Sequence, residues 1–306
     1  MTGTSPLGKA PYHRFKDFIA PGADRFAILQ DLLDELRFAF SVVTAGGNRH
    51  IFVASGPARL SGKPGLAGEE KTAGMVLVAH YDRTEGSPGA NDNGAAVFML
   101  IETALKMREN NLSRWMIIFT DKEELVLGEG IRDQGSYTLG KHLREGGFEH
   151  TRVFIFDACG TGDTLIISTM ADHLLKNEPG QGTARTRHLV AQLRGRALET
   201  ARRLLLDKVL LLPTPFSDDA GFLRAGIAAQ TITVLPAEEA APFVSLLRNK
   251  PDLVNALVSR DSQELHDRNF IPKTWRRLNG PGDNQYQLTP RHFGQVVRFA
   301  YALCRD

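Results

Sequence analysis

Cysteine is almost absent from this sequence of 306 residues, which contains only Cys159 and Cys304. Two cysteines cannot build a framework of disulfides, and they are too few to hold zinc through thiolates. Any metal site in the chain must therefore use histidine and carboxylate ligands. The shortage of cysteine also fits a reducing compartment, so we expect a cytoplasmic protein.

Long apolar runs and a dominant charge are also missing. No stretch of about 18 apolar residues occurs, so the sequence predicts no membrane span. The first ten residues, Met1–Ala10, lack the apolar core of a signal peptide. The net charge is only +2, from 37 basic and 35 acidic residues, which gives no electrostatic reason to expect nucleic acid or an anionic membrane as a partner. We therefore expect a soluble protein with neither of these partners.

What the sequence does contain is strands that alternate with helices. This pattern predicts an α/β fold, in which helices flank both faces of a mostly parallel central sheet. Apolar residues at helical spacing predict helices at about 24–36 and 93–107, and a last helix after Pro290. Short strands at 40–44 and 50–54 are expected to form a hairpin. Continuous apolar runs predict four buried strands, at Met75–Ala79, Trp115–Phe119, Val153–Phe156 and Gln230–Val234.

The stretch 180–208 is the hardest to interpret. A glycine-rich turn there precedes a helical segment that contains six arginines. A solvated helix face explains most of these charges, and recognition of an acidic partner is the alternative. We expect one domain spanning residues 1–306, with about 172–215 as the candidate for an insertion or lid.

Histidine and carboxylate side chains follow three of the four predicted buried strands. His80 follows the first, Glu123 and Glu124 follow the second after a short loop, and Asp157 follows the third. Asp92 lies in the loop that leads into the next helix. A single carboxylate at a strand end is usually a helix cap or a surface residue, but the carboxyl ends of parallel strands meet in one crevice. Imidazole and carboxylate without thiolate are the ligands of a catalytic zinc or manganese site.

The segments around these residues resemble a known family. Val76–Asp82 and Ser87–Ala96 are similar to the corresponding segments of the zinc aminopeptidases of peptidase family twenty-eight. That family includes bacterial leucyl aminopeptidases, the glutamate carboxypeptidase II branch and the glutaminyl cyclases. Glu123–Glu124, Phe154–Asp157 and Ser217–Ile227 resemble further segments of the family. The resemblance runs from about residue 24 to the C-terminus and implies the zinc-exopeptidase fold.

The resemblance also implies which residues hold metal. His80 and Glu124 would hold one ion, Asp92 would bridge it to a second ion, and Asp157 would bind the second. Zinc is the metal that the resemblance implies. We expect one tightly bound ion and a second, weaker one, for a reason that lies in the C-terminal part of the chain. The expected substrate is a small peptide or an aminoacyl compound.

Two other residues would assist the chemistry by the same resemblance. Glu123 would be the general base that takes a proton from water at the metal. Asp82 would accept a hydrogen bond from the outer nitrogen of His80 and fix the orientation of the imidazole. Adjacent glutamates make chemical sense, because Glu124 can bind the metal while Glu123 remains free to accept a proton.

The C-terminal part departs from the family pattern. The family has a ligand histidine in a His-Thr-x-x-Asp-Thr stretch that precedes Leu-x-Pro. The register through Asp283, Leu288 and Pro290 places Asn279 at that position, beside Asp157. An amide oxygen is a weak, neutral ligand compared with imidazole. The second metal site is therefore expected to be weakened.

Three consequences of this replacement stay open. The first is a one-metal enzyme that uses His80, Asp92 and Glu124. The second is a protein that fills its second site with a harder metal, and the third is a binding protein on this fold that has lost catalysis. His266 is the nearest upstream histidine that could replace the missing ligand, whereas His292 is expected to be structural. We expect a metal-dependent aminopeptidase-like hydrolase. The alternatives are an impaired or non-catalytic binding protein and a glutaminyl-cyclase-like transferase.

Overall fold

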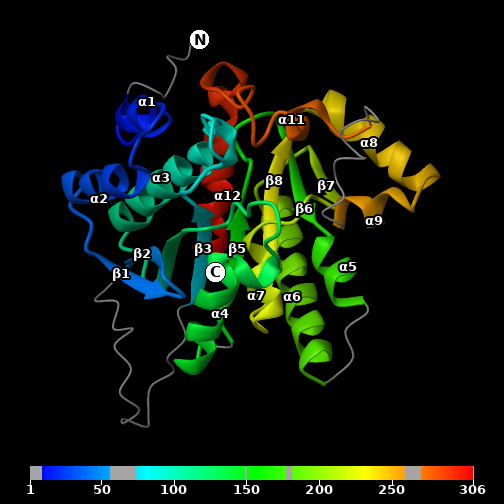
Figure 1. The fold of residues 1–306 in the computed structure, drawn as a ribbon, viewed down its shortest axis with the longest axis horizontal. Helices are drawn as coiled ribbons and strands as arrows, with labels where there is room; N and C mark the ends of the chain where they lie inside the picture. Colours follow the sequence, from blue (N-terminus) through cyan, green and yellow to red (C-terminus); the bar gives the residue numbers. More distant parts are fainter. Residues whose placement is uncertain (1–8, 56–73, 149, 177–180, 259–269, 306) are drawn as a thin grey trace.

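The computed structural model describes residues 9–55, 74–148, 150–176, 181–258 and 270–305. An eight-stranded mixed sheet lies at its centre, in the order β1-β2-β4-β3-β5-β8-β6-β7 (Figure 1). Strands β4, β3, β5 and β8 run parallel in the middle of the sheet, and β2 and β6 are antiparallel to them. The predicted α/β fold is confirmed. The strands are β1 (Phe40–Ala45), β2 (Asn48–Ala54), β3 (Met75–His80), β4 (Trp115–Thr120), β5 (Val153–Phe156), β6 (Thr164–Ser168), β7 (Val209–Leu212) and β8 (Ala229–Leu235).

Helices cover both faces of this sheet (Figure 1). Alternate residues of β3 point to opposite sides: Leu77 belongs to the core cluster under α3, α6 and α12, whereas Val78 belongs to the cluster under α4 and α7. No helix within the described ranges is both long and apolar enough to cross a membrane. The helices are η2 (Tyr12–Arg14), α1 (Phe15–Phe18), α2 (Arg25–Glu35), η3 (Ala90–Gly94), α3 (Ala95–Glu109), η4 (Ile131–Asp133), α4 (Gly135–Glu145), α5 (Met170–Lys176), α6 (Gln181–Arg203), α7 (Asp218–Arg224), α8 (Ala237–Asn249), α9 (Leu253–Val258), α11 (Lys273–Arg276), η5 (Gln285–Gln287), η6 (Pro290–His292) and α12 (Phe293–Arg305).

The stretch 172–215 is built into these layers. It contains most of α5, all of α6, and β7, which is the edge strand of the sheet. The apolar side of α6 is buried in the core through Val190, Leu193 and Ala197. The described residues of this stretch therefore form part of the layers of the fold, and its role as an insertion or lid stays a prediction. Its arginines are also largely accounted for, since Arg194 forms an ion pair with Asp172 at 2.7 Å and others bind main-chain carbonyls.

Candidate metal centre

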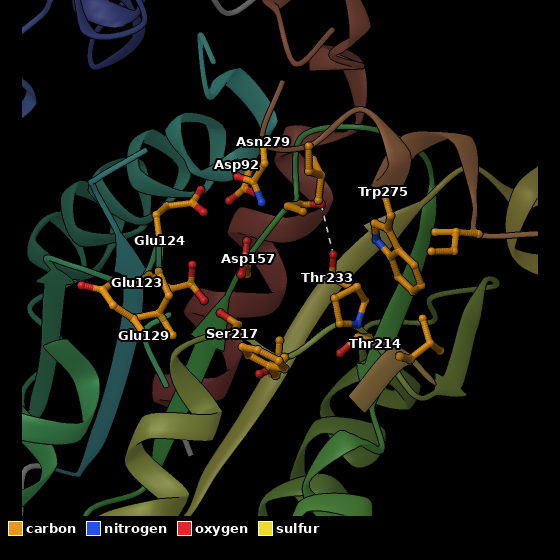
Figure 2. Close-up of a pocket in the computed structure, with 18 of the residues that line it drawn as sticks. Asp92, Glu123, Glu124, Glu129, Asp157, Thr214, Ser217, Thr233, Trp275 and Asn279 are labelled. Carbon is orange, nitrogen blue, oxygen red and sulfur yellow. Dashed lines mark hydrogen bonds between the residues drawn. The ribbon is translucent and has the colours of Figure 1, made fainter. Parts of the chain in front are cut away.

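The carboxyl ends of three neighbouring strands bring the predicted ligands together. His80 is the last residue of β3, which lies between β4 and β5 in the sheet. Asp157 directly follows β5, and Glu123 and Glu124 lie in the loop after β4. Asp92 belongs to η3, at the end of the loop that follows β3. The four carboxylates line one cavity, where they point toward a common region (Figure 2).

His80 is fully buried, and both of its ring nitrogens face carboxylates. Nδ1 lies 3.2 Å from Asp82 Oδ1. Nε2 lies 3.0 Å from Asp92 Oδ1 and 3.7 Å from Asp157 Oδ1, yet it makes no hydrogen bond. Burial disfavours a charged imidazole, but the carboxylates of Asp157, Asp82 and Asp92 outweigh this effect and raise the pKa of His80 well above its ordinary value. A buried nitrogen without a hydrogen bond is rare, and a metal ion would satisfy this one.

Two overlapping groups of side chains have suitable ligand atoms. Those of His80, Asp92 and Asp157 lie within 4.8 Å of one another, and so do those of His80, Glu123 and Glu124. Burial and the nearby Asp92 raise the pKa of Glu124 to about 9, and burial and Asp157 raise the pKa of Asp92. Carboxylates crowded in this way repel one another, and a bound cation would relieve the repulsion.

Asn279 lies beside Glu124. Its amide nitrogen, when turned toward Glu124, donates to both carboxylate oxygens at 2.7 and 2.9 Å and to Thr84 Oγ1 at 2.7 Å. The opposite orientation would place the amide oxygen against the carboxylate. The Thr84 hydroxyl also donates to Glu124 Oε2 at 2.9 Å. His80 was expected beside Glu124, and its ligand atoms do group with those of Glu124 as well as with those of Asp157. Asn279 was expected beside Asp157, whereas its direct contacts join it to Glu124.

The position of Asn279 follows from how the C-terminal segment is anchored. The buried carboxylate of Asp283 accepts hydrogen bonds from the main-chain N–H groups of Asn91 and Asp92, at 2.8 and 2.9 Å. This contact fixes the segment over the loop that follows β3, so that Asn279 meets Thr84 of the same loop. The left-handed backbone of Asn279, with φ of 61°, is one that asparagine tolerates well.

Glu123 is held by main-chain and side-chain contacts. Asp82 accepts hydrogen bonds from the N–H groups of Glu123 and Glu124, at 3.2 and 3.0 Å. Gln134 donates from Nε2 to Glu123 Oε1 at 3.1 Å. Burial raises the pKa of Glu123 well above its ordinary value, and the charge of Glu124 adds to this effect against the opposing influence of His80. The carboxylate of Asp82 therefore joins the imidazole of His80 to the loop that carries both glutamates.

The structure places neither His266 nor His292 at the cavity. His266 lies outside the described residues. His292 is in η6, where its Nε2 is 3.0 Å from Nε of Arg291, and it does not line the cavity. Thr84 and Gln134 were not expected, because an isolated threonine or glutamine between predicted elements carries no pattern in the sequence.

The cavity has a volume of about 650 Å³ and extends from the carboxylates to an apolar wall. At the mouth, Val126 and Leu127 are exposed to solvent. Thr214 and Thr233 lie between the carboxylates and the apolar wall (Figure 2), and Thr231 also lines the cavity. The apolar wall consists of Phe216, Leu257, Ile271, Trp275 and Leu278.

The sequence model of peptidase family M28 matches residues 64–256, which is more than half of the chain. The chain belongs to peptidase family M28. The family predicted from the motifs around His80 and Asp92 is thus confirmed. None of the curated proteins matches the sequence closely enough to be counted as a relative.

Several solved structures share the fold. A zinc aminopeptidase from Bacillus subtilis matches with a TM-score of 0.52 and 19% identity over 83% of this chain, which spans only 49% of the Bacillus chain. A leucine aminopeptidase precursor from Bacteroides thetaiotaomicron matches with a TM-score of 0.59 and 15% identity, over 96% of this chain and 94% of the other. A glutaminyl cyclase from an Acidobacteriales bacterium matches with a TM-score of 0.58 and 15% identity, over 100% of this chain and 96% of the cyclase chain. At these identities the likeness establishes the fold alone.

Proposed function

We propose that this protein is a zinc-dependent hydrolase that cleaves peptide or related amide bonds next to a free amino terminus. The observation that carries the proposal is the buried Nε2 of His80. It makes no hydrogen bond and it faces Asp92 and Asp157. Ligand atoms of His80, Glu123 and Glu124 also lie within 4.8 Å of one another.

The residues around His80 fit zinc. Zinc accepts imidazole nitrogens and carboxylate oxygens as ligands, and three protein ligands leave a further position open, as in catalytic zinc sites. Asp82 fixes the imidazole through Nδ1 and leaves Nε2 available for a metal. Zinc bound there would polarise the scissile carbonyl and lower the pKa of a water molecule.

Glu123 is proposed as the general base. Its carboxylate takes a proton from the attacking water as the water oxygen bonds to the carbonyl carbon. It then gives that proton to the amine nitrogen as the C–N bond breaks. Gln134 holds this carboxylate by its donated hydrogen bond, so that Glu123 faces the cavity without serving as a ligand.

The cavity indicates the kind of substrate. Its charged end contains only carboxylates, which attract a protonated amino terminus and repel a substrate carboxylate at that position. The apolar wall, which includes Phe216 and Trp275, would accept a bulky apolar side chain of the first residue. We therefore propose peptides with a large apolar residue at the amino terminus as substrates.

The second metal position is proposed to be weak. In the metal-free arrangement, the Asn279 amide already satisfies both oxygens of Glu124. A cation beside Glu124 would have to displace these hydrogen bonds, and it would gain only a neutral amide oxygen and the Thr84 hydroxyl in exchange. We propose one tightly bound zinc ion, at His80, Asp92 and Asp157.

Hydrolysis of a leucyl anilide by the purified protein tests this proposal. The protein is first freed of metal by a chelator and then supplied with zinc. We expect hydrolysis only with zinc, and we expect Glu123→Gln to retain zinc while its rate falls by about 100-fold or more. Glu85→Gln, which changes an exposed carboxylate, is the control that should hydrolyse at the parent rate.

Three results would contradict the proposal. Zinc binding without any hydrolysis by the parent protein would favour a binding protein. An unchanged rate in Glu123→Gln would remove the base assignment. A product of glutaminyl peptides that is lighter by one ammonia, with no free amino acid released, would identify a cyclising transferase instead.

A further inference from the structure

A buried arginine underlies the candidate metal centre. Arg25 is the first residue of α2 and is only 5% exposed. It lies outside the segment 64–256 that matches the family model. Burial lowers the pKa of Arg25 to about 9, so the guanidinium is still a cation at neutral pH. A buried cation is costly unless every one of its donors is satisfied.

The guanidinium satisfies its donors with main-chain carbonyls alone. Nε donates to Phe18 O at 3.2 Å. Nη1 donates to the carbonyls of Tyr81 and Asp82, at 3.2 and 3.0 Å. Nη2 donates to those of Pro88 and Gly89, at 2.6 and 2.8 Å. The five N–H groups of an arginine therefore meet five acceptors, which leaves this planar group little freedom to move.

Four of these carbonyls belong to the loop that carries metal ligands. Tyr81 and Asp82 directly follow His80, and Pro88 and Gly89 lead into η3, which contains Asp92. Arg25 thus joins the start of this loop to its end.

Gly89 is matched to this contact. Its φ is +56°, and a Cβ on Gly89 would lie only 2.6 Å from the carbonyl oxygen of Asp92 and 2.7 Å from the Nη2 atom of Arg25. The absence of a side chain at Gly89 allows the guanidinium to reach the carbonyls of the loop. The glycine at position 89 therefore leaves room for the guanidinium of Arg25.

We propose that Arg25 is a positioning residue for the metal centre, which holds the two ends of the loop at the distance that lets His80 and Asp92 bind the same ion. This inference rests on the zinc site of the proposed function. Without Arg25 the carbonyls lose their shared donor, and the loop can separate the two ligands. The affinity for zinc then falls although His80 and Asp92 are both retained.

Zinc affinity of the metal-free full-length protein tests this role, since it requires no turnover. Isothermal titration with zinc chloride against a competing chelator gives Kd, and thermal unfolding of the metal-free protein gives its stability. Arg25→Met should raise Kd by about 10- to 100-fold, the usual effect of removing a residue that orients a ligand. Arg25→Lys keeps up to three donors and should raise Kd less.

Leu29→Ala is the control for a merely structural effect. Leu29 is on the same helix, is fully buried in the core, and has no part in the loop. Its truncation should lower the unfolding temperature and leave Kd unchanged. An unchanged Kd in both Arg25 variants would overturn the inference, and so would an equal rise in Kd for Leu29→Ala. If Arg25→Met does not fold, Arg25→Lys alone decides between these results.

The same titration separates this inference from the proposed function. Tight zinc binding by the parent protein, weakened in the Arg25 variants but without hydrolysis of any peptide, supports the positioning role and refutes the hydrolase. Hydrolysis by the parent with an unchanged Kd in the variants supports the hydrolase and refutes the positioning role.

Discussion

Replacing Asn279 by histidine changes the contact that separates the two halves of the metal centre. In the parent protein the Asn279 amide donates to both oxygens of Glu124. An ordinary hydrogen bond contributes about 0.5–1.5 kcal/mol, so the two together contribute about 1–3 kcal/mol. A cation beside Glu124 must break this contact, which lowers its affinity by about 10- to 100-fold.

Two variants separate the loss of the Asn279 hydrogen bonds from the gain of a new metal ligand. Asn279→Gly removes the amide without straining the left-handed backbone, so the second position should bind about 10- to 100-fold more tightly. Asn279→His removes the amide and adds an imidazole, and histidine is also tolerated at positive φ. Its second position should therefore bind more tightly than that of Asn279→Gly.

Titration of the metal-free proteins with zinc, together with metal content per chain, measures these differences. We expect one tight ion in the parent and a second ion of measurable affinity in Asn279→His. Two equally tight ions in the unmodified protein would refute the reasoning. A second position that is equally weak in all three proteins would show that the Asn279 contact does not control it.

The remaining predictions concern the cavity wall and a buried histidine. Phe216→Ala should lower kcat/KM for a leucyl substrate relative to an alanyl one by about 10-fold or more, because an apolar contact to the larger side chain is lost; an equal fall for both substrates would contradict this. Burial lowers the pKa of His50 to about 4. Between pH 6.5 and pH 4 only the unfolded chain takes up the proton, so the free energy of unfolding should fall by about 3 kcal/mol over this range. Urea unfolding at pH 7 and 4.5 should show a smaller loss in His50→Gln, and equal losses in both proteins would refute the assignment.

The middle of the sheet could be predicted because its strands are buried on both faces. Continuous apolar runs identified β3, β4, β5 and β8, whose ends differ from the predicted ones by no more than one residue. The convergence of the ligands followed from the geometry of parallel strands. Strand β7 was not predicted although its four residues are all apolar, and it lies partly exposed at the edge of the sheet.

The division of ligands within the site could not be predicted in the same way. Sequence register placed Asn279 near the carboxylates, but its partner depends on the hydrogen bonds of Asp283, which connect segments far apart in the chain. Arg25 was missed for a similar reason. It follows the N-cap residue Asp24 at the start of a helix, where a charged residue is usually solvated.

Asp82 connects groups that have different proposed roles. One carboxylate holds the imidazole of His80 and the main chain of Glu123 and Glu124. A substitution at Asp82 therefore disturbs the proposed metal ligand His80 and the proposed base Glu123 in a single step. A double-mutant cycle between His80 and Glu123 should be strongly non-additive. A variant at Asp82 therefore changes the surroundings of His80 and Glu123 at the same time and cannot by itself tell their effects apart.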